Sequence, residues 1–182
     1  MKIAISGAHS TGKTTLIETL RVMPQFKDYE FFSNITRQLK EQGFKINEAG
    51  NDATQLKMME IHAENANKDI NAIYDRCIMD PLAYTIYLNR QGQVSAEATL
   101  QTWQAFSANI GKYDVIFYLE PEFEIVDDGV RATDSQFRND ILEIFNFIIK
   151  MYEIPVICLT GSVQERVQQI LNVLKDPQYA NK

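Results

Sequence analysis

Short apolar runs alternate with longer segments of helical periodicity along the 182 residues of this chain. An apolar run with little polar alternation is typical of a parallel strand buried on both faces. Strands that alternate with helices indicate an α/β fold whose parallel sheet is covered on both sides. Five runs of this kind predict strands, at Ile3–Ser6, Tyr29–Ser33, Ala72–Asp75, Val115–Leu119 and Pro155–Leu159.

The segments between these runs predict seven helices. Asp80 is expected to cap the fourth of them, with Pro81 at its first helical position. Ser162 and Glu165 have the spacing of a capping box ahead of the last helix. The predicted helices are Thr14–Val22, Ile35–Gln42, Asp52–Ile70, Pro81–Asn89, Ala96–Ile110, Gln136–Tyr152 and Val163–Leu174.

Residues 7–14, GAHSTGKT, form a complete GxxxxGK[ST] phosphate loop between the first predicted strand and the first predicted helix. A triphosphate needs inward-pointing backbone N–H groups and the positive end of a helix. Lys13 is expected to reach the β- and γ-phosphates, and the Thr14 hydroxyl to bind Mg²⁺. The predicted ATP contacts within this region are Gly7, Ser10, Thr11, Gly12, Lys13, Thr14 and Thr15.

Composition narrows the class of protein. Apolar residues make up 45% and charged residues 23%, as in ordinary globular proteins, and one domain over 1–182 is expected. No run approaches the ~20 apolar residues that span a bilayer, and a strand at the N-terminus predicts a cytoplasmic protein. The net charge of −6 argues against a protein that coats nucleic acid. A small basic cleft is still compatible with it, from Lys13, Arg37, Arg76, Arg131 and Arg138.

Cysteines and histidines give little sign of a metal site. Cys77 and Cys158 lie beside or within predicted strands, which predicts buried free thiols. His9 is expected to face solvent or to lie near the acceptor, and His62 to belong to the buried stripe of its helix. Two lone histidines and two distant cysteines argue against zinc.

Asp75 and Arg76 end the third predicted strand. Ligands meet the carboxyl ends of parallel strands, so this pair is expected to face the phosphate loop. Asp75 is the predicted catalytic carboxylate, as a ligand of Mg²⁺ or its waters or as the acceptor of a hydroxyl proton. Arg76 is predicted to bind an anionic part of the substrate. A surface ion pair at a strand end is the alternative.

The segment after the fourth strand predicts a lid at about 121–138. It contains Asp127-Asp128-Gly129-Val130-Arg131, followed by Arg138. Arginines on a closing segment neutralise a phosphoryl group in transfer and exclude water. Arg131 is the predicted catalytic arginine, Arg138 a further contact to ATP, and Asp128 a contact to the substrate; the alternative is a solvated loop.

The acceptor side of the site is predicted less sharply. Asn34 and Arg37 follow the second strand, where an acidic residue often contacts the acceptor hydroxyl in nucleoside kinases. Ser33 and Asn34 take that place here, which moves the expected base to Asp75. Asp80 and Tyr84 share a helix face and are candidate substrate contacts, although capping alone would explain Asp80. Trp103 and Phe106 are expected in the core.

These motifs together resemble the AAA_28 or NadR-like group of P-loop kinases, which includes the ribosylnicotinamide kinase domain. The resemblance rests on GAHSTGKTTL at 7–16, Asp75-Arg76 with Asp80 and Tyr84, Tyr113-Asp114, and DDGVR at 127–131, and it spans nearly the whole chain. The wider relatives are deoxynucleoside and thymidylate kinases. The resemblance implies a nucleoside monophosphate kinase-like fold with strand order 2-3-1-4-5, MgATP as donor, and a homodimer as one assembly found in the group.

The expected activity is transfer of the γ-phosphoryl group of ATP to a hydroxyl or phosphate of a nucleoside-like acceptor. Asn34 departs from the acid common in the group, and some phage-encoded relatives phosphorylate 5-hydroxymethyluracil in DNA, so a DNA acceptor bound by Arg37, Arg76, Lys40 and Lys45 is an alternative. A nucleotide-dependent switch or a non-catalytic regulator are the others. A GTPase is disfavoured because Asn67-Lys68-Asp69-Ile70 lacks the spacing of a guanine signature.

Overall fold

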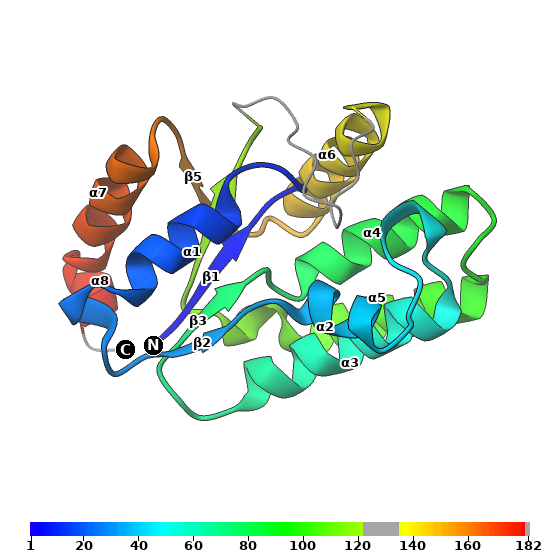
Figure 1. The fold of residues 1–182 in the computed structure, drawn as a ribbon, viewed down its shortest axis with the longest axis horizontal. Helices are drawn as coiled ribbons and strands as arrows, with labels where there is room; N and C mark the ends of the chain where they lie inside the picture. The colour runs from blue at the N-terminus through cyan, green and yellow to red at the C-terminus, as the bar shows by residue number, and fades with distance from the viewer. Residues whose placement is uncertain (122–134, 181–182) are drawn as a thin grey trace.

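The computed structural model describes residues 1–121 and 135–180 and has a five-stranded parallel sheet at its centre (Figure 1). The strand order is β2-β3-β1-β4-β5, as predicted. Ile5 is in register with Asp75 and with Phe117, so the carboxyl ends of the three central strands lie at one edge of the sheet. The strands are β1 (Lys2–Ser6), β2 (Glu30–Phe32), β3 (Ala72–Asp75), β4 (Val115–Leu119) and β5 (Val156–Leu159).

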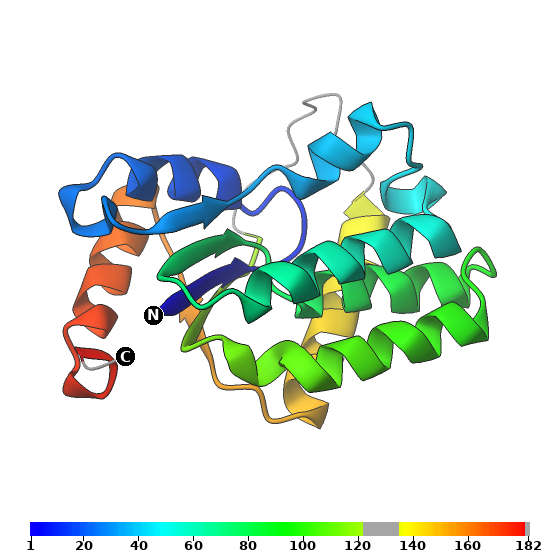
Figure 2. The same ribbon diagram turned by 90° about the horizontal axis from the view of Figure 1, so that it is seen from below.

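Successive side chains of β1 enter two different cores. Ile3 and Ile5 pack with α1 (Lys13–Arg21) and α7 (Val163–Leu174) on one face of the sheet. Ala4 packs on the other face, which is covered by α3 (Asp52–Asn67), α4 (Met79–Arg90), α5 (Ala96–Asn109) and α6 (Ser135–Met151). Figures 1 and 2 show the two groups of helices on opposite sides of the sheet. Burial on both faces explains why the strands read as continuous apolar runs.

All predicted strands and helices are present, with ends that differ from the prediction by at most three residues. The capping box is confirmed, because Ser162 accepts from the Glu165 backbone and Glu165 accepts from the Ser162 backbone. Phe106 is fully buried and Trp103 packs against the same core, as expected. The remaining elements are α2 (Ile35–Glu41), α8 (Pro177–Ala180), and the 3₁₀ helices η1 (Pro24–Phe26), η2 (Asn47–Ala49) and η3 (Ile110–Lys112).

Two local predictions are wrong. Asp80 is not the N-cap of α4: the helix begins at Met79, and Pro81 is its third residue. A proline is tolerated there because the first N–H groups of a helix have no intrahelical acceptor. Cys158 is exposed rather than buried, because it lies near the carboxyl end of the edge strand β5; Cys77 is buried, as predicted. None of the helices in the described ranges is long and apolar enough to cross a bilayer.

Candidate active site

The phosphate loop connects β1 to α1, and two glycines permit its shape. Gly7 has φ 134°, and a Cβ there would lie 2.4 Å from the main-chain oxygen of Leu119 in β4. Gly12 has φ 88° and precedes the first residue of α1. Both values belong to the left-handed half of conformational space, where glycine has no steric cost. The loop therefore turns tightly against the sheet and delivers the chain to the N-terminus of α1, the positive end of the helix dipole.

Lys13 lies over this loop with its ammonium group buried. Its Nζ donates to the carbonyl oxygen of Gly7 at 2.7 Å and to the Thr11 hydroxyl at 3.1 Å, and it also contacts the carbonyl oxygen of Ala8. The Thr11 hydroxyl in turn donates to the Ala8 oxygen at 3.1 Å. These hydrogen bonds hold a positive charge in the concave side of the loop, where an anion would bind.

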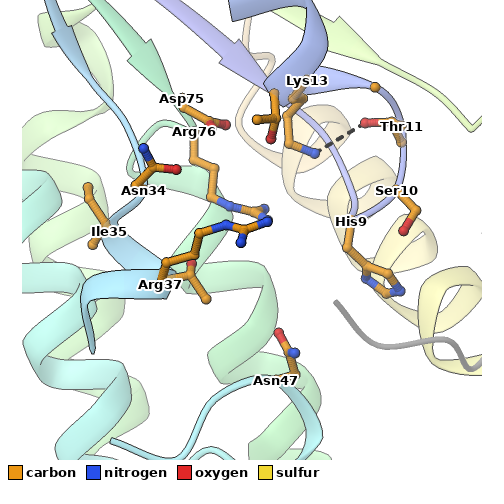
Figure 3. Close-up of a pocket in the computed structure, with 13 residues that line it drawn as sticks. His9, Ser10, Thr11, Lys13, Asn34, Ile35, Arg37, Asn47, Asp75 and Arg76 are labelled. Atoms are coloured by element: carbon orange, nitrogen blue, oxygen red, sulfur yellow. Dashed lines mark hydrogen bonds between the residues drawn. The ribbon is translucent and has the colours of Figure 1, made fainter. Parts of the chain in front are cut away.

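A cavity of about 650 Å³ opens above the loop (Figure 3). Figure 3 shows Arg37 and Arg76 reaching into it from the side opposite Lys13. Three cationic side chains around one cavity form a suitable environment for a polyphosphate. The lining residues come from the loop, the start of α2, η2 and the end of β3: His9, Ser10, Thr11, Gly12, Lys13, Thr14, Asn34, Ile35, Thr36, Arg37, Asn47, Asp75 and Arg76.

Thr14 and Asp75 line this same cavity and are the residues suited to hold Mg²⁺. The described residues contain no group of three or more His, Cys, Asp and Glu side chains that would bind a metal by themselves. Mg²⁺ does not need one, since it is bound by one or two protein oxygens together with substrate phosphates and water. The oxygen donors present therefore fit a nucleotide-borne magnesium ion.

Asp80 is the most buried carboxylate beside the cavity, with 1% of its surface exposed. Its Oδ2 accepts from Ser6 Oγ at 2.7 Å and from the Cys77 N–H at 2.9 Å. Its Oδ1 pairs with Nη1 of Arg76 at 3.4 Å. Burial raises the pKa of Asp80, while the charges of Arg76 and Lys13 act in the opposite direction. Asp80 thus fixes the turn between β3 and α4 and holds the Arg76 guanidinium at the cavity.

Arg76 occupies a left-handed backbone conformation with φ 85°. A residue with a Cβ has a cost of roughly 1–2 kcal/mol in that conformation, so the surrounding contacts must hold it. Burial lowers the pKa of Arg76, but Tyr84 and two nearby carboxylates outweigh that effect and raise it overall. The guanidinium also lies 5.8 Å from the centre of the Tyr84 ring. Arg76 is therefore a permanently charged group in a fixed position.

His9 is buried, with 3% of its surface exposed, so the expectation that it faces solvent is wrong. Its ring stacks on Phe137 of α6 with centroids 5.1 Å apart, and its Nδ1 lies 3.2 Å from the Tyr84 hydroxyl. These contacts join the phosphate loop to α4 and α6. Their geometry supports the other expectation, a histidine near the second cavity described next.

A second cavity, of about 410 Å³, lies beside the first between η2, α3 and α4. The two cavities share Thr36, Asn47 and Arg76 as lining residues. The other residues of the second cavity are Ile46, Thr54, Gln55, Met58, His62, Asp80, Pro81 and Tyr84. A cavity suited to polyphosphate is thus continuous with a less charged one.

Sequence comparison decides the family. The AAA_28 profile, described as an AAA domain, matches residues 2–166. The chain belongs to the AAA_28 family. No curated protein matches this AAA_28 chain in sequence.

Solved structures similar to this AAA_28 protein share its fold at low sequence identity. One is deoxyadenosine kinase from M. mycoides with the products dCMP and dCDP, with a TM-score of 0.67 and 18% identity over 96% of this chain and 98% of that one. Another is NadR in complex with NR, with a TM-score of 0.72 and 19% identity over 95% of this chain. A NadR complex with NAD and AMP-PNP has a TM-score of 0.69 and 16% identity over 99% of this chain. This chain spans about half the length of the NadR chains.

The structure brings most of the predicted site residues together. Of the predicted nucleotide contacts, Gly7 lies beneath the loop, and Thr15 is on the exposed side of α1. Arg138 is half-buried in α6. Arg131 and Asp128, and with them most of the predicted lid, lie outside the described residues. The first or second cavity is lined by Ser10, Thr11, Gly12, Lys13, Thr14, Asn34, Arg37, Asp75, Arg76, Asp80 and Tyr84.

Sequence reasoning missed the polar residues of α3 that line the second cavity. Gln55 and His62 are both buried there. Their seven-residue spacing places them on one helix face. Two polar residues two turns apart on a buried face were the available signal. It was overlooked because a lone histidine on such a stripe is usually packed in the core.

Proposed function

We propose that this AAA_28 protein is an ATP- and Mg²⁺-dependent kinase that transfers the γ-phosphoryl group to a hydroxyl of a nucleoside-like acceptor. The observation that carries the proposal is the continuity of the two cavities through Arg76, Thr36 and Asn47. ATP would occupy the cavity over the phosphate loop and the acceptor the cavity against α3 and α4. Their shared border is where a phosphoryl group would pass from one to the other.

The residues of the first cavity have distinct roles in this reaction. Lys13 and Arg76 stabilise the charge of the phosphoryl group in transfer, and such electrostatic stabilisation is usually the largest contribution to catalysis. Thr14 and Asp75 hold Mg²⁺, which neutralises the β- and γ-phosphate oxygens. The acceptor oxygen bonds to the γ-phosphorus as the bridging bond to ADP breaks. Asp75 orients the acceptor hydroxyl and takes its proton.

The segment that follows β4 completes the site in this proposal. Residues 121–138 form a lid of the single kinase domain, with Arg131 closing over the γ-phosphate, Arg138 contacting ATP and Asp128 contacting the substrate. Such a closure excludes water and prevents loss of the phosphoryl group to hydrolysis. Arg37 and Asn34, which line the open side of the first cavity, are the proposed contacts to the polar part of the acceptor.

The decisive experiment incubates the protein with γ-labelled ATP and Mg²⁺ against two acceptor pools. One pool contains free nucleosides, nucleotides and nicotinamide riboside, and the other contains duplex DNA with and without 5-hydroxymethyluracil. Label in the free pool is expected. Label only in the modified DNA would replace the free acceptor by a DNA base, and label in neither would overturn the kinase proposal.

Matched lysine variants show whether the label comes from this site. Lys13→Ala is expected to abolish transfer, because it removes the buried ammonium from the loop. Lys27→Ala, at an exposed lysine after α1, should retain wild-type activity. Equal activity in the two variants would mean that the phosphoryl transfer does not occur at the phosphate loop.

A further inference from the structure

The second cavity contains two buried polar side chains that the phosphoryl chemistry does not use. Gln55 and His62 project from α3, and the apolar side chains of Ile46, Met58 and Pro81 line the same space. Apolar walls with a few fixed polar groups are typical of a site for a flat organic ligand. An acceptor identified from this cavity rests on the proposed function, because it would occupy that same site.

His62 has 2% of its surface exposed, and no residue in the described part of the chain forms a hydrogen bond with its Nε2. Leaving a buried ring nitrogen without a partner is unfavourable, so a ligand that supplies one gains affinity. Burial, with a smaller effect from the charge of Arg76, lowers the pKa of His62 to about 3. The ring is therefore neutral at physiological pH and offers one nitrogen as a donor and the other as an acceptor.

Gln55 is held in one place. Its Oε1 accepts a hydrogen bond from Thr85 Oγ1 at 3.2 Å. Gly50 leaves room for the amide, because a Cβ at that position would lie 2.9 Å from Gln55 Nε2 and 2.7 Å from Leu88 Cδ1. A fixed amide recognises the pattern of donors and acceptors on a ligand rather than its charge.

The charges at the cavity disfavour a cationic ligand. Asp80 is the acidic residue among its described lining residues, and this carboxylate already accepts from Ser6, the Cys77 backbone and Arg76. Arg76 is the cationic one. A ligand with a positive ring would meet the Arg76 charge and would find no carboxylate that is not already engaged, whereas a neutral ring meets neither problem.

We infer that this cavity binds the electrically neutral base of the acceptor and discriminates against a cationic pyridinium ring, with Gln55 and His62 as the specificity-determining residues. The base enters between α3 and α4, and the sugar extends past Arg76 toward the phosphate loop. His62 Nε2 and the Gln55 amide each form a hydrogen bond with the base. The acceptor is thus a nucleoside of the ordinary neutral bases rather than nicotinamide riboside.

A matched pair of ligands isolates the charge. Nicotinamide riboside carries a cationic ring, and its 1,4-dihydro form has the same ribose and carboxamide on a neutral ring. Calorimetry at pH 8 on protein saturated with a non-hydrolysable ATP analogue compares the two, together with neutral nucleosides and a short single-stranded oligonucleotide. The neutral form is expected to bind at least tenfold more tightly. Equal or tighter binding of the cation, or binding of none of these ligands, would overturn the inference.

Two variants test the residues themselves. Gln55→Glu keeps the acceptor for Thr85 but adds a carboxylate, so the preference should shift at least tenfold toward the cation. Gln101→Glu makes the same change on the exposed face of α5 and should leave it unaltered. His62→Phe keeps a ring of similar shape and should weaken binding of neutral nucleosides about tenfold with unchanged affinity for the ATP analogue. An unaltered preference in folded Gln55→Glu protein would contradict the assignment.

The outcomes separate this inference from the kinase proposal. Phosphoryl transfer with preferred use of nicotinamide riboside would overturn the neutral-base inference and leave the kinase. Selective binding of neutral nucleosides without transfer to any acceptor would overturn the kinase and leave the cavity assignment. Tighter binding of the oligonucleotide than of every free nucleoside would identify a base within nucleic acid as the ligand.

Discussion

Arg166 of α7 donates a hydrogen bond from Nη1 to the main-chain oxygen of Thr11 in the phosphate loop, at 2.7 Å. The two residues are 155 positions apart in the chain, and Arg166 is completely buried. A trans peptide points its C=O and the following N–H in opposite directions. A guanidinium behind the loop that holds the Thr11 oxygen therefore turns the Gly12 N–H toward the other side, where the phosphates would bind.

Replacing Arg166 tests this relationship. Arg166→Met is expected to weaken binding of ATP about tenfold, because the peptide is no longer held and a buried positive charge behind the phosphates is lost. Arg166→Lys should restore part of the affinity, since an ammonium also donates to a carbonyl. Calorimetric titration with an ATP analogue measures both. Arg21→Met, at a partly exposed arginine of α1, serves as the control, and unchanged affinity in folded Arg166→Met would refute the positioning role.

Asp75 and Asp80 are expected to respond differently to the same substitution. Asp75→Asn should lower kcat by about 10²-fold or more, because the residue lines the phosphate cavity as the proposed base and metal ligand, with little loss of stability. Asp80→Asn should lower the free energy of unfolding by about 3 kcal/mol, because it leaves the buried Arg76 charge without its carboxylate. Urea unfolding and steady-state kinetics on both variants check the assignment. Near-normal turnover in Asp75→Asn would exclude that residue from the reaction.

Two glycines with positive φ separate backbone strain from collision. Gly43 has φ 88° and open space where a Cβ would lie, so Gly43→Ala should cost about 1 kcal/mol of stability from the backbone conformation alone. Gly7→Ala should cost about 1–3 kcal/mol more, since its Cβ would meet the Leu119 main chain and force the loop to move. Thermal unfolding of the two variants gives the difference. Equal losses would show that the loop can shift freely against β4.

His62 predicts a loss of stability in mild acid. Its pKa is lowered from 6.5 to about 3 in the folded protein, so the unfolded chain binds a proton between these values and the folded chain does not. The stability due to the neutral ring is complete above pH 6.5 and declines as the pH falls toward 3. From pH 7 to pH 5, wild type should lose about 2 kcal/mol more than His62→Gln. Parallel pH profiles of unfolding in the two proteins would show that His62 titrates normally.

The sequence by itself determined the elements and their class. Continuous apolar runs identify doubly covered strands because burial on both faces leaves no position for polar alternation. The phosphate loop was readable because glycines at sharp turns and a lysine at a helix start are local requirements. The same local reading failed at Asp80, where the carboxylate serves the distant Ser6 as well as the turn, and at Cys158, whose exposure depends on the position of β5 at the sheet edge.

Only the tertiary structure decided how these pieces form one site. Arg166 reaches Thr11 because α7 packs beside α1, and His62 meets the second cavity because α3 faces α4. Such contacts join residues far apart in the chain, and their geometry depends on how the helices pack on the sheet. Spacing along a helix tells which residues share a face, but packing determines whether that face meets the core, solvent or a ligand.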